Sequence, residues 1–159
     1  TSSAASSSSS SSANDKAYGT QLLAIYDSMA ALDTRIADCA TEFNNNFTNS
    51  SKSVRQSYAN PAKSVQDDIE TQMNALKKLK ANTPSSYATE TQHVDELLND
   101  LYNRIHVINL AWSNSLSYSD PAAHEDAIVA PIAADKVEGG NKYNLHFKEY
   151  YPAWKFSVK

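Results

Sequence analysis

Residues 87–116 read YATETQHVDELLNDLYNRIHVINLAWSNSL, and this stretch decides the fold. Its large apolar residues recur at steps of three and four, which places them on one side of a helix with 3.6 residues per turn. They are Tyr87, Val94, Leu97, Leu98, Leu101, Ile105, Ile108, Trp112 and Leu116. Such a stripe stabilises a helix only by packing against other helices, so the sequence predicts a helical bundle with Leu101 and Ile105 in its core.

Two earlier segments carry stripes with the same period. The first consists of Leu22, Ile25, Tyr26, Met29, Leu32, Ile36, Cys39, Phe43 and Phe47. The second consists of Val54, Tyr58, Val65, Ile69, Met73, Leu76 and Leu79. Both are narrow and heptad-like, as in coiled coils, where helices pack at a shallow angle. We therefore predict an all-α fold, an up-down-up three-helix bundle with helices at about 14–47, 54–82 and 85–117.

The joint between the first two helices leaves alternatives open. Residues 44–53 read NNNFTNSSKS, and such side chains compete with the helix for backbone hydrogen bonds. A break there makes the three helices similar in length, whereas a first helix that continues to Tyr58 leaves half of its stripe without a partner. The second helix begins either near Val54, with a kink, or at Pro61, because proline fits only the first turn of a helix without distortion.

The C-terminal third predicts shorter elements. Ser119-Asp120-Pro121 is a cap followed by proline, which indicates a short fourth helix at about 121–130, halted by Pro131. Gly139-Gly140 indicates a turn, and the aromatic segment after it is expected to dock on the bundle. Tyrosine and tryptophan are also favoured in recognition surfaces. The candidate partner-binding residues are Tyr143, Tyr150, Tyr151 and Trp154, unless these rings only fill the seam between tail and bundle.

Residues 1–13 begin TSSAASSSSSSS and are predicted to form a disordered tether, since they have nothing to bury. Residues 14–159 then form a single helical domain. The chain starts at Thr1 without a methionine, so we expect that a signal peptide was removed. A linker at this place suggests a lipidated cysteine just before Thr1, and a tail without an anchor is the alternative. We expect contact with a membrane only through such an anchor.

The composition of the chain argues against nucleic-acid binding, an all-β fold and a disulfide. The net charge is −4 and no cluster of Lys or Arg forms a basic face, so we set nucleic acid aside as a partner. Three glycines are too few for the many tight turns of an all-β fold. The single cysteine, Cys39, lies on the first apolar stripe, which predicts a buried apolar residue without a disulfide.

The pattern of histidines and carboxylates does not predict a catalytic or metal site. Glu90 and His93 form a Glu-x-x-His step, but a di-iron bundle requires two such steps and no second one exists. No Gly-x-Ser-x-Gly elbow or phosphate-binding glycine loop is present either. We therefore predict no enzyme activity, no metal and no cofactor; a histidine beside a carboxylate in a buried cleft would favour an enzyme instead.

The arrangement resembles small bacterial surface lipoproteins of unknown function with a helical-bundle body. The likeness covers about residues 1–117 and consists of the serine-rich start, a lysine-rich second helix, the joint Asn82-Thr83-Pro84-Ser85-Ser86-Tyr87 and a leucine-rich third helix. Those proteins often carry a histidine one helical turn after the tyrosine, where this chain has Thr91. The resemblance implies a lipid anchor and a location outside the cytoplasm, but no activity.

The sequence thus predicts a non-catalytic surface protein, anchored outside the cytoplasm, that binds a protein or a cell-envelope component. The alternative is a carrier that holds a small apolar ligand between its helices. A carrier would need a cavity, and Tyr26, Met29, Trp112 or Phe147 would line it.

Overall fold

The structure, a computed structural model, describes the backbone of residues 3–159 and the side chains of residues 12–159. Within that range the chain forms five α-helices, three single-turn 3₁₀ segments and one short hairpin, so the prediction of an all-α fold is confirmed. The elements are α1 (Ser3–Asn46), α2 (Lys52–Leu79), η1 (Lys80–Asn82), η2 (Ser85–Tyr87), α3 (Ala88–Ser117), η3 (Pro121–His124), α4 (Glu125–Ala134), β1 (Lys136–Val137), β2 (Gly140–Asn141) and α5 (Lys142–Ala153).

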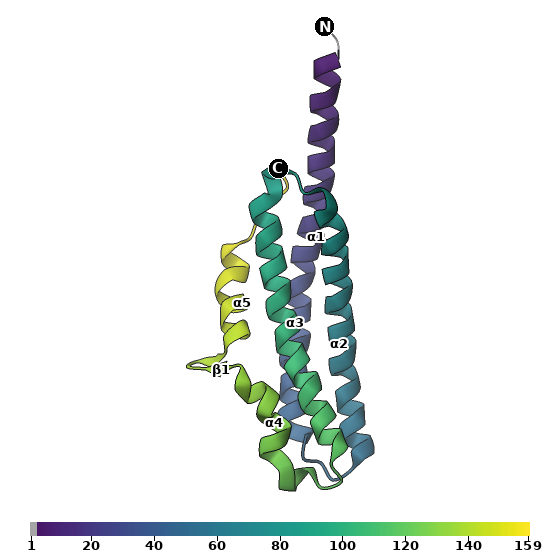
Figure 1. Ribbon diagram of the computed structural model, residues 1–159, viewed down its shortest axis with the longest axis vertical. Helices are drawn as coiled ribbons and strands as arrows, with labels where there is room; N and C mark the ends of the chain where they lie inside the picture. Colours follow the sequence, from purple (N-terminus) through teal and green to yellow (C-terminus); the bar gives the residue numbers. More distant parts are fainter. Residues whose placement is uncertain (1–2) are drawn as a thin grey trace.

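The three long helices lie side by side, and the chain reverses direction at each joint between them (Figure 1). α4 and α5 both pack against α3, and the β1–β2 hairpin that joins them projects from the side of the molecule (Figure 1). The first turns of α1 extend beyond the other helices at the end where α2 and α3 meet. None of the helices in residues 3–159 has an apolar stretch of the length that a bilayer requires.

The core is built largely from the three predicted stripes, although Val54, which was expected on the second stripe, is 36% exposed. Leu98, Leu101 and Ile105 have at most 1% of their surface exposed, as the periodicity of the third stripe predicts. Phe43 of α1 meets Trp112 of α3 edge to face, with 5.0 Å between the ring centroids. Each fully buried side chain of this size contributes about 1.5–3 kcal/mol, so the stability of the helices comes from this contact between stripes.

The joint between α1 and α2 agrees with a break at residues 48–53. α1 ends at Asn46, and α2 begins at Lys52, where the Ser51 hydroxyl caps the helix by accepting the Val54 amide at 3.3 Å. The alternatives with a first helix reaching Tyr58, or a second helix starting at Pro61, are wrong because α2 continues through Pro61.

Two further boundaries differ from the sequence prediction. α1 begins at Ser3 rather than near residue 14. Residues 1–2, and the side chains up to residue 11, lie outside the described part of the chain, and the predicted tether at residues 1–13 stays a prediction. At the other joint, η1 and η2 replace the last turn of the second helix and the first turn of the third.

The prediction that Pro131 halts the fourth helix is wrong. α4 runs to Ala134 and contains Pro131. Proline has no amide hydrogen, so it leaves the carbonyl of Ala127, four residues earlier, without its helical donor. The Asn114 side chain on α3 donates to that carbonyl at 3.3 Å and supplies the missing bond.

The aromatic tail packs against the bundle. Tyr151 stacks on Tyr26 of α1 at 4.5 Å, and Phe156 meets the same ring from its edge. The last residue is also held, since the Lys159 amide donates to the Tyr87 hydroxyl at 2.7 Å and its ammonium lies 2.8 Å from Glu90. These contacts connect the end of the chain to the start of α3, and they fix the position of α5.

Candidate functional site

The projecting hairpin depends on two glycines. Val137 pairs with Gly140, and Lys136 pairs with Asn141, in an antiparallel ladder. Gly139 and Gly140 have φ angles of 93° and 138°, a region that side chains with a Cβ rarely adopt. The Gly-Gly turn that the sequence predicts is therefore what permits so tight a reversal between α4 and α5.

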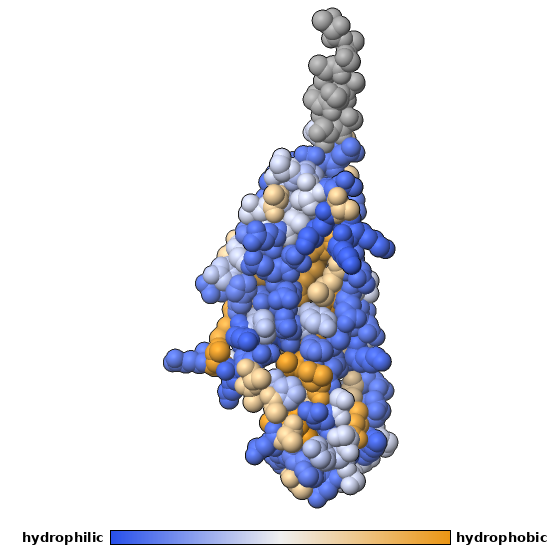
Figure 2. Space-filling model, viewed as in Figure 1, coloured by the Kyte–Doolittle hydropathy of each residue, from blue (hydrophilic) through white to orange (hydrophobic). Residues whose placement is uncertain are grey.

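Two aliphatic side chains are exposed at the hairpin and on the helix that follows it. Val137 is 45% exposed, and Leu145, on the outer side of α5, is 37% exposed. Leu145 lies against the turn, since its Cδ1 is 3.6 Å from the position of a Cβ on Gly139. Figure 2 shows the projection with an apolar base and a hydrophilic tip. Lys136 and Glu138, which flank Val137 in the sequence, are both exposed. We call Val137 and Leu145, with these two flanking charges, the hairpin surface.

The base of the hairpin is held by local bonds. The Asn141 side chain caps α5 by accepting the amides of Tyr143 at 2.9 Å and Asn144 at 3.0 Å. The Lys142 amide donates to the Asp135 carbonyl at 3.0 Å, and the two side chains form an ion pair at 3.4 Å. These bonds fix the direction in which the hairpin leaves the bundle.

The four aromatic residues predicted to bind a partner do not form one exposed patch. Tyr150, Tyr151 and Trp154 are partly buried and pack against the core. Tyr143 is half-buried, and the Lys142 ammonium lies 5.1 Å from its ring centroid. Periodicity did not identify Val137 and Leu145, because both lie outside every apolar stripe; the Gly-Gly turn between them was the available signal.

A cluster of histidines and aromatic rings forms the contact between α3 and the tail. Trp154 stacks on His93 at 4.1 Å and on Tyr150 at 4.5 Å. His146 lies 4.5 Å from the Tyr150 ring, and its Nδ1 is 2.6 Å from the Asp100 carboxylate. Burial raises the pKa of Asp100 above its usual value, although the bond to His146 lowers it in part.

The Asp100–His146 pair borders an open cleft of about 400 Å³ that is also lined by Asp95, Glu96 and Asn99. An aspartate that orients a histidine is one part of many hydrolytic sites, but those sites also need a nucleophile. The lining of this cleft offers carboxylates and an amide but no hydroxyl or thiol. We interpret the pair as a tie between α3 and α5.

Glu90 and His93, which form the Glu-x-x-His step of the sequence, both contact the C-terminal tail. Burial favours a higher pKa for Glu90, but the hydrogen bond and charge of Lys159 lower it below its usual value, and His93 lies under Trp154. Both residues thus serve to dock the tail. Among the described residues, no three His, Cys, Asp or Glu side chains are grouped as metal ligands. Cys39 is 6% exposed, as predicted, and burial raises its pKa.

An apolar cleft of about 160 Å³ lies where α1, α3, α4 and α5 meet. Its lining includes Ile36, Ala40, Phe43, Val107, Ile108 and Ile132. One polar atom of the lining stands out, since Asn144 Oδ1 is buried and has no hydrogen-bond partner in the described part of the chain. Tyr26, Met29, Trp112 and Phe147, the lining that the sequence suggested, are buried in the core and do not border this cleft.

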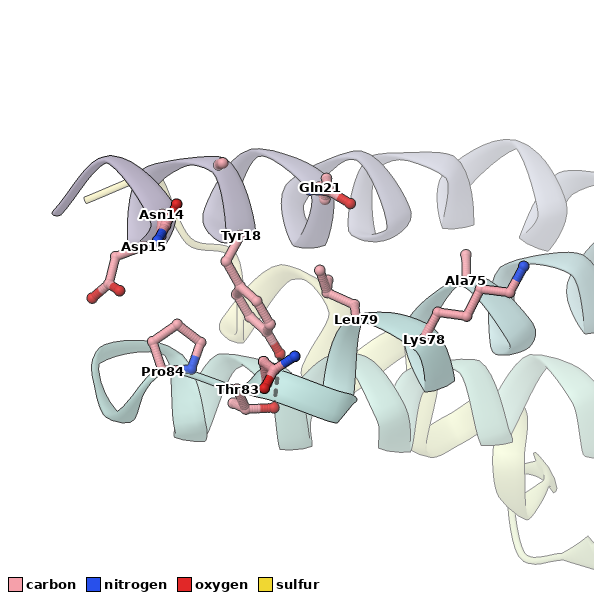
Figure 3. A pocket seen from close by; sticks show the side chains of 11 residues that line it. Asn14, Asp15, Tyr18, Gln21, Ala75, Lys78, Leu79, Thr83 and Pro84 are labelled. Carbon is pink, nitrogen blue, oxygen red and sulfur yellow. Dashed lines mark hydrogen bonds between the residues drawn. The ribbon is translucent and has the colours of Figure 1, made fainter. Parts of the chain in front are cut away.

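A larger groove, of about 1080 Å³, lies at the other end of the bundle, between α1 and the end of α2 (Figure 3). Tyr18 crosses it and bonds the Thr83 hydroxyl at 3.1 Å. Its wall mixes Asp15 and Lys78 with small apolar side chains. The groove offers space, but no concentration of charge or apolar surface that would select a ligand.

Comparison of this chain with known protein families, with curated proteins and with solved structures finds no match.

Proposed function

We propose that this chain is a non-catalytic surface protein, located outside the cytoplasm, that binds a protein or cell-envelope partner through the hairpin surface. In this proposal an up-down-up three-helix bundle is the rigid body, and the C-terminal segment docked on it is the platform. The observation that carries the proposal is the exposed Val137 on the projecting hairpin, with the exposed Leu145 of α5 against the hairpin turn.

Exposed apolar side chains on a projection favour binding to a second surface that covers them. Single apolar side chains are common on protein surfaces, but two of them around one projecting turn are easily buried by a second surface. Burial of such a pair contributes roughly 25 cal/mol per Å² of apolar area, and Lys136 and Glu138 supply the polar rim that recognition surfaces usually have. A hairpin fixed at its base also loses little conformational entropy on binding. These features favour a protein partner over a soluble envelope component.

The proposal is tested by photo-crosslinking in the source cells. A photoreactive amino acid at Val137 is expected to give a discrete covalent adduct, and the additional change Leu145→Asp to reduce its yield at least about fivefold, because an ionised carboxylate in an apolar interface is costly. The matched control places the same group at Leu110, which is 42% exposed on α3. Equal adducts at both positions would contradict the proposal.

The location rests on the serine-rich start and on the resemblance to bacterial surface lipoproteins. The sequence encoded just before Thr1 tests it. An apolar leader ending in Leu-x-x-Cys is expected, and a cytosolic segment in its place would remove the anchor without affecting the hairpin surface.

A carrier of a small apolar ligand is the second candidate, and the apolar cleft favours it. A dry cavity of about 150 Å³ has room for one benzene-sized ring. The unpaired Asn144 Oδ1 adds a preference for a ligand with a hydroxyl or amine donor.

Native mass spectrometry with added phenol tests the carrier function. Binding is expected to be saturable in the wild-type protein and to be lost in Ala40→Leu, which fills the cleft. Ala30→Leu, at an exposed position of α1, is the matched control. Binding that survives Ala40→Leu would exclude the cleft as the site.

A further inference from the structure

One buried arginine lacks a carboxylate partner. Arg35 pairs with Asp68 and Arg104 pairs with Asp33, so two of the three arginines in the sequence are neutralised by a carboxylate. Arg55 is only 1% exposed, and within residues 12–159 it forms no such pair. A buried cation without a counter-charge is costly, so its surroundings should show how the charge is compensated.

The partners of Arg55 are carbonyl and hydroxyl oxygens at the end of α3. Its guanidinium donates to the carbonyl of Ser115, to the Ser115 hydroxyl at 3.3 Å and to the carbonyl of Tyr118 at 3.1 Å. The Ser115 hydroxyl in turn donates to the Phe47 carbonyl at 2.6 Å. The charge therefore meets only dipoles, and Arg55 Nε is buried with no acceptor in the described part of the chain.

Arg55 borders a pocket of about 370 Å³ beside the start of α2. The other lining residues are Ser50, Lys52, Leu116, Ser117, Tyr118 and Ser119. Of the residues that the structure describes, only Lys52 and Arg55 line the pocket with a charged side chain, and both are cationic. It also adjoins the N-terminus of a 28-residue helix, where the first amides lack helical acceptors and the dipole favours negative charge.

We propose that this pocket binds a small tetrahedral oxyanion, of the phosphate or sulfate class. The anion would lie beside the Arg55 guanidinium, with the Lys52 ammonium, the Lys52 and Ser53 amides and the lining serine hydroxyls as donors. Two independent features point to the same chemistry: the helix N-terminus attracts an anion, and the buried Arg55, whose charge meets only the carbonyl and hydroxyl dipoles at the end of α3, carries an orphaned N–H. A free ion and the phosphate of a lipid headgroup present the same chemistry.

The test is a titration of the whole protein with sodium phosphate, and separately with sulfate, at constant ionic strength. NMR signals of the Arg55 Nε–H and of the Lys52 and Ser53 amides are expected to shift together and to saturate. Lys52→Gln is expected to weaken binding about tenfold, the usual effect of losing one charge-assisted hydrogen bond. Lys63→Gln, which changes an exposed lysine farther along α2, is the matched control and should have no effect.

Vesicles distinguish the two sources of phosphate. Lys52-dependent binding to phosphatidylglycerol vesicles, without saturable binding of free phosphate, would assign the site to a headgroup. A saturable response to free phosphate would assign it to the free ion. The proposal is overturned if neither probe gives a Lys52-dependent response, or if Lys63→Gln weakens binding as much as Lys52→Gln, because the response is then general charge screening. All three NMR signals belong to the folded wild-type protein, so the result does not depend on an Arg55 variant that folds.

Discussion

Gly19 lies at the closest approach between α1 and the joint before α3. A Cβ at this position would be 2.2 Å from the Tyr87 hydroxyl oxygen and 2.4 Å from Cζ of the same ring. The ring is completely buried, so it has no room to move aside. The glycine is needed here for space, and not for an unusual backbone angle.

This contact reverses the usual effect of replacing a helical glycine with alanine. Replacing a helical glycine with alanine normally stabilises a protein by up to about 1 kcal/mol. We expect Gly19→Ala instead to lower the free energy of unfolding by about 1–3 kcal/mol, as overpacked cores do. A denaturant melt measures the change. In a Tyr87→Leu background the same substitution should cost much less; equal costs in both backgrounds would show that the two residues do not meet.

Tyr26 makes stability sensitive to alkaline pH. Its hydroxyl donates to the Tyr151 carbonyl, and burial, with a smaller effect of Tyr151 and Asp27, raises the pKa of Tyr26 to about 12. Because this pKa exceeds the ordinary value of 10, the stabilisation is complete below pH 10 and is lost as the pH rises through 12.

We expect the wild-type protein to lose roughly 2–3 kcal/mol more than Tyr26→Phe between pH 9 and pH 12, from a shift of about two pH units. Melts of both proteins across that range measure the difference, and the comparison cancels the titration of exposed tyrosines and lysines. Parallel stability curves for the two proteins would show that the hydroxyl titrates as an exposed tyrosine does.

At the scale of an element, α2 contains a proline that its packing tolerates. Pro61 is exposed on the outside of the helix, and Ala62 beside it is completely buried. The Asn109 side chain on α3 donates to the Ala62 carbonyl at 3.1 Å and to Gln66 at 2.9 Å, which ties the helix to α3 just after the proline. The expected halt at Pro131 was wrong, and the sequence left two alternatives open at Pro61, because such tertiary bonds are not visible in local sequence.

We expect Pro61→Ala to raise the free energy of unfolding by about 1–2 kcal/mol. Alanine restores the amide that donates to the Ser57 carbonyl, which stabilises the helix by up to about 3 kcal/mol. Because alanine also makes the unfolded chain more flexible, up to about 1 kcal/mol of this gain is lost. Thermal or denaturant melts measure the gain, with Lys63→Ala as the control for propensity alone. A loss of stability would mean that the proline shapes the contact with α3.

At the scale of the whole molecule, apolar periodicity predicts the packing of the long helices. Core positions such as Leu98, Leu101 and Ile105 follow from a period of 3.6, because only one face of each helix can be buried. The hairpin surface did not follow, since Val137 and Leu145 belong to no stripe and only the fold of the Gly139 turn brings Leu145 to the hairpin. The pocket beside Arg55 was equally invisible, because it combines the start of α2 with the end of α3, which are distant in sequence.

The proposed function requires that the docked tail holds the hairpin in one position on the bundle. This position is measured by pulsed electron paramagnetic resonance as the distance between two spin labels. One label is attached at Glu138→Cys on the hairpin and the other at Lys77→Cys on α2, in a Cys39→Ala background. The reference pair Lys63→Cys and Lys77→Cys lies on one helix, about 21 Å apart along its axis at 1.5 Å per residue. We expect one distance distribution for the hairpin pair, as narrow as that of the reference pair. A broad or two-peaked distribution would contradict a single position of the hairpin.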